Sequence, residues 1–109
     1  MNTDRIIVLI TTPDLESAQR IANHLVEKQL AACVNILAQV QSIFRWQGAV
    51  QQEHEVLLIV KTRVELLDQQ VIPAVKAIHP YQVPEIIALP VLGGSPDYLD
   101  WLDQSVQIK

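Results

Sequence analysis

The sequence has only one cysteine, Cys33, and only three glycines among 109 residues. A single cysteine cannot form a disulfide within the chain, and it makes no Cys-x-x-Cys motif for metal or redox chemistry. Three glycines are too few for a Gly-rich loop that cradles phosphates. No apolar stretch approaches the roughly 18 uncharged residues of a membrane-spanning helix. These shortages exclude disulfide scaffolds, phosphate-loop proteins and helical membrane proteins.

Charged residues are also few. They make up 18% of the chain, with 8 Lys and Arg against 12 Asp and Glu, so the net charge is −4. Because the chain is acidic and has no basic cluster, we expect neither nucleic acid nor a membrane as a partner. The first residues do not predict a secretory signal, and together with the lack of disulfides this favours the cytoplasm.

Apolar residues, in contrast, make up 50% of the sequence even without glycine. Average soluble domains have about 45–50% with glycine counted. A chain of this length forms one domain, residues 1–109, which is too small to bury so much apolar surface alone. We therefore expect a subunit interface.

Four stretches have the pattern of β-strands: residues 6–10, 34–46, 56–60 and 85–89. The first and third are apolar on both faces, which is typical of central strands. The second alternates, with apolar residues on even positions, which predicts one buried face. A turn at Gly48 and residues 51–53 should follow it. Pro84 and Pro90 bracket the fourth strand and favour an edge position.

Three helices are predicted between and after these strands. Thr12 and Pro13 have the pattern of a helix start, and so do Ser95 and Pro96. Thr62 is expected to cap the second helix, which Pro73 should interrupt. The buried stripe expected on the first helix is Leu15, Ala18, Ala22, Leu25 and Val26. The order strand-helix-strand-strand-helix-strand plus a last helix predicts an α+β, ferredoxin-like split βαβ sandwich.

No local metal motif is present, because Cys33, His24, His54 and His79 are not spaced three or four residues apart. Any metal site would have to be assembled in space. His79 stands at the end of the second helix, either interacting with the helix dipole or facing a cleft. Cys33 is either a small buried apolar residue or a ligand.

Carboxylate, aromatic and lysine side chains form a second set of candidates. Glu53 and Glu55 share a strand face and offer a contact to a hard cation. Lys61 is the one charge at the end of an apolar strand. Lys61 belongs to a wider group of mixed polar and aromatic side chains, which also contains Arg45, Trp46, Tyr81, Glu85, Tyr98 and Trp101. This group fits either ordinary interface packing or a pocket between subunits for a small anion or a metal complex, with Lys61 as the fixed charge.

Five segments together carry a resemblance to a known family: residues 31–35, 44–48, 55–62, 79–86 and 97–102. They include Trp-x-Gly at 46–48 and His-Pro-Tyr-x-x-Pro-Glu at 79–85. In these motifs the chain resembles the CutA divalent-ion tolerance family. The resemblance implies a ferredoxin-like homotrimer whose long hairpins extend sheets across subunits. It also implies a cytoplasmic protein that is not an enzyme and is linked to tolerance of copper and other divalent cations.

The resemblance also implies site residues. Those that match the family motifs, and are expected to line a ligand cleft between subunits, are Cys33, Trp46, Glu55, Lys61, Tyr81 and Glu85. In some bacterial members copper ligation is assigned to a cysteine of the first strand and to two adjacent histidines. The corresponding positions here are Ile10 and the pair Ile78-His79. His79 is therefore the one metal ligand implied, for copper or another divalent cation.

Three functions follow. The first is a trimeric binding protein for divalent metal or a small-molecule ligand. The second is a regulatory module similar to trimeric PII signalling proteins. The third is an enzyme using Lys61, Glu85, Tyr81 and His79 as acid–base groups.

Overall fold

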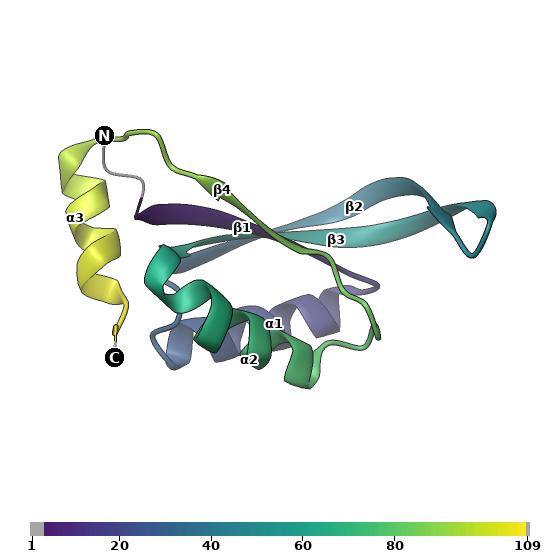
Figure 1. Cartoon of the computed structure of the whole chain (residues 1–109), viewed down its shortest axis with the longest axis horizontal. Coiled ribbons are helices and arrows are strands. Elements are labelled where there is room, and N and C mark those ends of the chain that lie inside the picture. The colour runs from purple at the N-terminus through teal and green to yellow at the C-terminus, as the bar shows by residue number, and fades with distance from the viewer. Residues whose placement is uncertain (1–3, 109) are drawn as a thin grey trace.

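A four-stranded antiparallel sheet organises the computed structural model, which describes residues 4–108. Along the chain lie β1 (Arg5–Thr12), α1 (Leu15–Glu27), β2 (Cys33–Trp46), β3 (Ala49–Arg63), the 3-10 turn η1 (Val64–Leu66), the π-helical turn η2 (Leu67–Val71), α2 (Ile72–Ile78), β4 (Ile86–Pro90) and α3 (Pro96–Ser105). Figure 1 shows α1 and α2 against one face of the sheet and the β2–β3 hairpin projecting beyond it. The α+β, ferredoxin-like prediction is confirmed.

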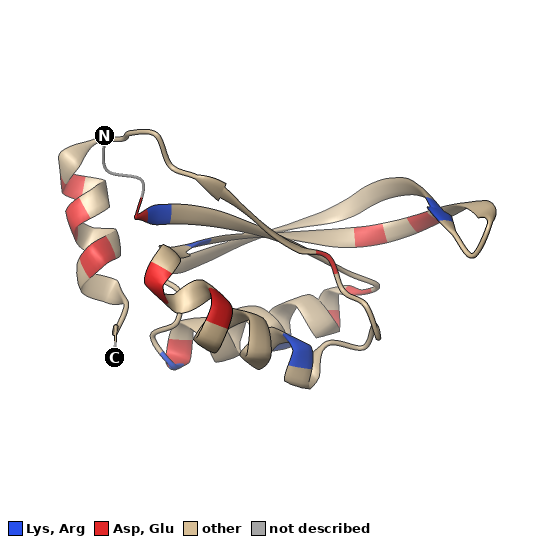
Figure 2. Ribbon diagram, in the orientation of Figure 1, with Lys and Arg blue, Asp and Glu red and all other residues tan. Residues whose placement is uncertain are grey.

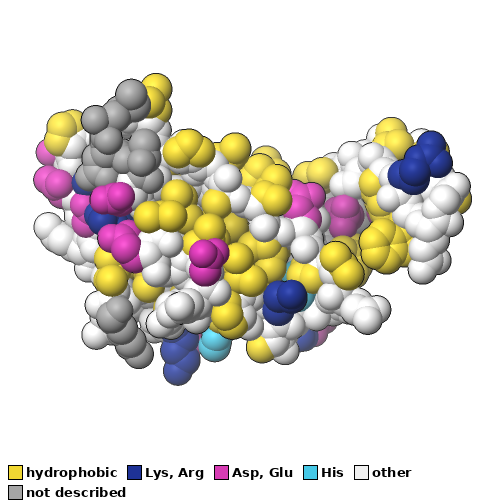
Figure 3. All heavy atoms as spheres, viewed as in Figure 1, with side chains coloured by type: hydrophobic (Ala, Val, Ile, Leu, Met, Phe, Trp, Pro, Cys, Tyr) yellow, Lys and Arg dark blue, Asp and Glu magenta, His cyan; other side chains and the backbone are white. Residues whose placement is uncertain are grey.

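The strand order is β2-β3-β1-β4, so β1 and β3 are central and β4 is an edge strand, as predicted. Val8, Ile10, Leu58 and Val60 are fully buried beneath the helices. We call the opposite side the open face. There Ile87 and Leu89 are about half exposed (53% and 49%). Figure 3 shows hydrophobic side chains gathered over the middle of the visible surface, where β4 crosses in front of β1.

Two predicted helix caps are wrong. Asp14, not Thr12, caps α1, because its Oδ1 accepts the Ser17 backbone N–H at 2.7 Å. Thr12 ends β1 instead. Thr62 lies within β3, fully buried, and its hydroxyl donates to the Leu30 carbonyl at 2.7 Å.

The buried side of α1 also differs from the predicted stripe. Leu15 and Val26 are exposed by 47% and 41%. The buried residues of α1 are Ser17, Ala18, Ile21, Ala22 and Leu25. The stripe is centred on Ile21, so Leu15 and Val26 lie at its margins.

Pro73 interrupts the second helical segment as predicted. The chain passes through η1 and η2 before α2 begins, and the Ile72 N–H donates to the Leu67 carbonyl in a π-type turn. Because Pro73 has no N–H, it cannot continue the regular i→i−4 ladder from the preceding turn. It is accepted instead in the first turn of α2.

A β-bulge in β2 overturns the predicted alternation. Leu37 pairs with Leu57 and Val40 with Glu55, so β2 has one extra residue there. Gln39, at the bulge, has a φ of 65°. Because paired residues share a face, the even positions of β2 face the helices before the bulge and the open face after it.

The hairpin turn comes earlier than expected, at Gln47 and Gly48, so residues 51–53 belong to β3. Pairing between β1 and β3 ends at Thr12 and Val56. Residues 40–55, which we call the arm, therefore form a two-stranded ribbon beyond the sheet, visible in Figure 1.

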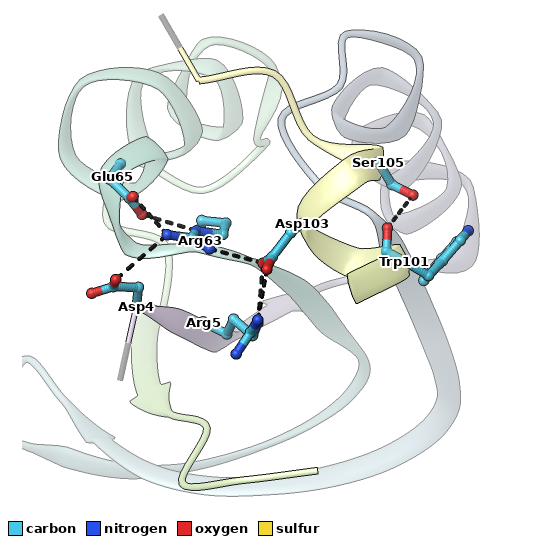
Figure 4. Close-up of polar contacts among 7 residues, drawn as sticks. All are labelled: Asp4, Arg5, Arg63, Glu65, Trp101, Asp103 and Ser105. Atoms are coloured by element: carbon cyan, nitrogen blue, oxygen red, sulfur yellow. Dashed lines mark hydrogen bonds and ion pairs between the residues drawn. The ribbon is translucent and has the colours of Figure 1, made fainter. Parts of the chain in front are cut away.

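Ion pairs attach α3 to the sheet. Asp103 of α3 accepts from Arg5 of β1 at 3.0 and 2.6 Å and from Arg63 of β3 at 2.8 Å. Arg63 also pairs with Glu65 at 2.8 Å. Figure 4 shows Asp103 between the two arginines. Leu102 of α3 is buried, and α3 begins at Pro96 as predicted, although the Ser95 side chain makes no capping bond.

Candidate functional site

A cleft of about 780 Å³ lies between the arm and residues 79–85, which we call the connector. Its lining residues are Thr11, Pro13, Ser42, Ile43, Phe44, Trp46, Glu53, Glu55, Tyr81, Gln82, Val83 and Glu85. The bulge contributes directly, because it turns Phe44 and Trp46 to the face that carries Glu53 and Glu55. Four of the six cleft residues implied by the family motifs are thus brought together: Trp46, Glu55, Tyr81 and Glu85.

Tyr81 and Glu55 join the two sides of the cleft. The Tyr81 hydroxyl donates to Glu55 Oε2 at 2.9 Å. Glu55 is only 8% exposed. Burial, this hydrogen bond and the Glu55 charge raise the pKa of Tyr81 to about 12. Tyr81 is therefore a neutral donor at physiological pH and not a general base.

His79 lies buried next to the cleft and fixes the connector. Its Nδ1 accepts the Tyr81 backbone N–H at 3.0 Å, so Nε2 carries the proton and donates to the Thr11 carbonyl at 2.8 Å. Both ring nitrogens are thus engaged, and neither presents a free lone pair to a metal ion. The ring of His79 also lies against that of Tyr81, with centroids 5.1 Å apart.

Negative charge dominates the cleft. Its lining contains Glu53, Glu55 and Glu85 but no Lys, Arg or His. Within the described chain, no basic group lies within ion-pair distance of these three carboxylates. Figure 2 shows acidic positions on the β3 strand of the arm and just before β4. The cleft therefore favours a positively charged ligand over an anion.

Cys33 and Lys61 lie elsewhere on the open face, paired across β2 and β3. Lys61 Nζ donates to the Asn35 side chain and lies 3.8 Å from Cys33 Sγ. Burial and the neighbouring Cys33 raise the pKa of Tyr98, from α3. Lys61 lies six residue steps beyond Glu55 along β3, which is a distance of about 20 Å. The four residues of the enzyme hypothesis are therefore not assembled within one chain.

Metal ligands do not converge within residues 4–108, where no group of three or more His, Cys, Asp and Glu side chains could hold an ion.

Thr11 and Pro13 line the cleft, although the sequence pattern does not indicate them as site residues. They line a cleft because the connector passes close to them, and the path of the connector cannot be predicted from local periodicity. Glu53 is indicated by its two-residue spacing from Glu55.

Comparison with known proteins identifies the family. Residues 6–105 match the family model described as CutA1 divalent ion tolerance protein. The divalent-cation tolerance protein CutA of Thermus thermophilus is 52% identical over 99 residues, which is 91% of this chain and 95% of that protein. A solved structure of the divalent cation tolerance protein Cut A1 from Thermus thermophilus has a TM-score of 0.91 at 50% identity. It covers 94% of this chain and 99% of its own.

A plant relative is longer. Protein CutA, chloroplastic, of Arabidopsis thaliana is 47% identical over 102 residues, which is 94% of this chain and 56% of that protein. The chain thus spans little more than half of that relative, whose name places it in the chloroplast. No helix between residues 4 and 108 is long and apolar enough to cross a membrane. The family match covers nearly the whole fold, so the chain belongs to the CutA1 divalent ion tolerance family.

Proposed function

We propose that the protein acts in tolerance of divalent cations as a cytoplasmic homotrimer, binding a divalent metal ion or a small-molecule ligand in clefts between subunits. The names of its relatives support the tolerance role. The observation that carries the assembly is the open face of the sheet. Ile87 and Leu89 are half exposed there, and no described helix covers them. Exposed apolar patches of this kind mark interaction sites.

The arm supports the same proposal. A two-stranded ribbon is marginally stable by itself, and Ile43, Trp46 and Val50 are 63%, 49% and 64% exposed on it. Contact with a second copy would cover these side chains and extend its sheet. Such packing would also bring Cys33 and Lys61 of one copy to the Trp46, Glu55, Tyr81 and Glu85 cleft of another.

His79 is proposed as a positioning residue of this cleft and not as a metal ligand. Its two hydrogen bonds hold the connector against β1 and place Tyr81 opposite Glu55. A divalent cation would then meet carboxylates and not imidazole. We propose binding and no catalysis, because Tyr81 keeps its proton and Lys61 lies far from it in the same chain.

Light scattering and copper calorimetry test the proposal. A trimer of this 12.3 kDa chain has a mass of about 37 kDa. We expect that mass at micromolar concentration, and saturable copper binding that weakens in Glu55→Gln. A folded monomer, or a trimer that binds no divalent metal, would contradict the corresponding part of the proposal.

A further inference from the structure

The only thiol of the chain lies in contact with a lysine amine, outside the cleft described above. Cys33 of β2 and Lys61 of β3 are paired across the two strands, so their side chains share the open face. Lys61 Nζ lies 3.8 Å from Cys33 Sγ and also donates to the Asn35 side chain. These contacts hold a thiol and an amine side by side within one copy, with no movement of the backbone needed to bring them together.

The surroundings of the sulfur are those of a reactive cysteine. Cys33 is partly exposed, and Lys61 Nζ donates a hydrogen bond to its Sγ. Tyr98 of α3 adjoins the same sulfur, since burial and the neighbouring Cys33 raise the pKa of Tyr98. Cysteines that are partly exposed and next to a positive charge are the ones that small oxidants attack most readily.

Once oxidised, Cys33 has few partners within reach. A sulfenic acid usually condenses with a second thiol to a disulfide, but the chain has no other cysteine. A sulfenic acid also condenses with nitrogen to a sulfenamide. Among the described residues, Lys61 Nζ is the side-chain nitrogen that contacts the sulfur. The pair therefore places the second reactant of a sulfenamide next to the first.

We propose that Cys33 and Lys61 form a redox-sensitive cross-link, a sulfenamide between Sγ and Nζ, when the protein meets hydrogen peroxide. In the first step the thiol is oxidised and the peroxide is reduced, which gives the sulfenic acid and one water. In the second step the neutral Lys61 amine, having released its ammonium proton to solvent, attacks the sulfur. The S–N bond forms, the S–O bond breaks, and the hydroxyl leaves as water with a proton of the amine.

This cross-link would change both the sheet and its surface. It would join β2 to β3 covalently at the first residue of β2, and it would remove the positive charge of Lys61 from the open face. The cross-link goes beyond the proposed function, because it requires neither a bound metal nor a bound ligand. Hydrogen peroxide is little larger than water, so the reaction does not need a wide opening to the sulfur when another copy packs on this face.

Peptide mapping tests the cross-link. The purified protein is treated with hydrogen peroxide, denatured without reductant and digested with trypsin. Trypsin cleaves after Arg45 and Arg63 but not after a Lys61 that is joined to sulfur, so we expect peptides 29–45 and 46–63 as one species. Its mass should be about 2 Da below the sum of the two peptides, for the two hydrogen atoms lost. Dithiothreitol should separate them again, because a thiol reduces the S–N bond.

Variants identify the reacting amine. Lys61→Arg keeps the positive charge but replaces the amine with a guanidinium, which does not lose its proton in proteins. There we expect peroxide to carry Cys33 to the sulfinic acid, with a gain of about 32 Da and no cross-link. Lys76→Arg, at an exposed position of α2, is the matched control and should cross-link as the parent does. Cys33→Ser should show neither product.

Three results would overturn the inference: a Cys33 that peroxide does not oxidise, oxidation of Cys33 to a sulfinic acid or to a disulfide between copies without the S–N bond, or a loss of about 2 Da that persists in Lys61→Arg. The last would place the bond on a backbone nitrogen. Light scattering and copper binding are measured on untreated samples. A copper-binding trimer that forms no cross-link overturns this inference alone, whereas a cross-linked monomer that binds no copper overturns only the proposed function.

Discussion

At the residue scale, the proton of Tyr81 links the cleft to stability. Burial and the hydrogen bond to Glu55 raise the pKa of Tyr81 to about 12 in the folded chain, whereas a tyrosine in an unfolded chain titrates near 10. The folded state thus holds this proton more tightly. Its contribution to stability is complete below about pH 10 and is lost as the pH rises toward 12.

Tyr81→Phe removes this pH dependence. Between pH 9 and pH 12, the free energy of unfolding of the parent should fall by on the order of 2 kcal/mol more than that of Tyr81→Phe. Urea denaturation at each pH measures both. Tyr98 is present in both proteins and cancels in the comparison. Parallel profiles would show that the Tyr81 pKa is not raised.

His79→Ala separates positioning from metal ligation. The change removes the hydrogen bonds to Thr11 and Tyr81, so we expect about 2 kcal/mol of destabilisation in urea. Copper affinity should stay within about threefold of the parent. His54→Ala, at an exposed position of the arm, should cost less than about 0.5 kcal/mol. A loss of copper affinity of about tenfold or more in His79→Ala would instead establish His79 as a ligand.

At the scale of elements, the bulge in β2 holds a non-glycine residue in a left-handed conformation. Gln39 has a φ of 65°, which is unfavourable for a side chain with a Cβ atom. Gln39→Gly should therefore stabilise the fold by about 0.5–1 kcal/mol in urea denaturation. Gln41→Gly, in the same strand but not at positive φ, should destabilise it by a similar amount. Equal effects at both positions would contradict this account.

The attachment of α3 is sensitive to acid. Hydrogen bonds from Arg5 and Arg63 lower the pKa of Asp103, so its contribution to stability is present above about pH 4 and is lost as the pH falls further. Asp103→Asn should lower Tm by roughly 5 °C at pH 7, with a smaller difference at pH 2.5. Thermal unfolding followed by circular dichroism measures both. A difference that is unchanged at pH 2.5 would exclude this charge effect.

Sequence pattern predicts elements better than it predicts their ends. The unbroken apolar runs in β1 and β3 predict their central places, and Pro73 predicts the interrupted helix. The bulge has no such signal, because Gln39 replaces the glycine that usually marks one. The predicted cap of α1 is wrong because two residues that can cap a helix, Thr12 and Asp14, lie within three positions of each other.

The candidate site is predictable to the same extent. Motifs indicate Trp46, Glu55, Tyr81 and Glu85, which the fold brings into one cleft. Cys33 and Lys61 belong to the same family motifs but lie outside the cleft. Lys61 is about 20 Å from Glu55 along β3, and Cys33 of β2 pairs with Lys61. Periodicity gives the face of a strand, but not which loop lies opposite it.

At the scale of the whole molecule, assembly should depend on the open face and not on the helical one. Ile87→Glu puts a charge on a side chain that is 53% exposed in one copy, so each copy should still fold. By light scattering we expect the mass to fall from that of three 12.3 kDa chains toward that of one. Leu15→Glu, 47% exposed on α1, is the matched control and should remain trimeric. The reverse result would place the interface on the helices.

The arm is expected to become stably folded later than the rest of the chain. Residues 40–55 pair only with each other, whereas the body has a four-stranded sheet and a buried core. Local opening of such a ribbon requires little free energy, so its amide hydrogens should exchange with solvent long before those of β1. A newly synthesised chain would thus fold its four-stranded sheet and core first, while its arm remained only loosely formed. The arm would gain lasting protection only when another copy docks against it, which makes folding of this segment depend on chain concentration.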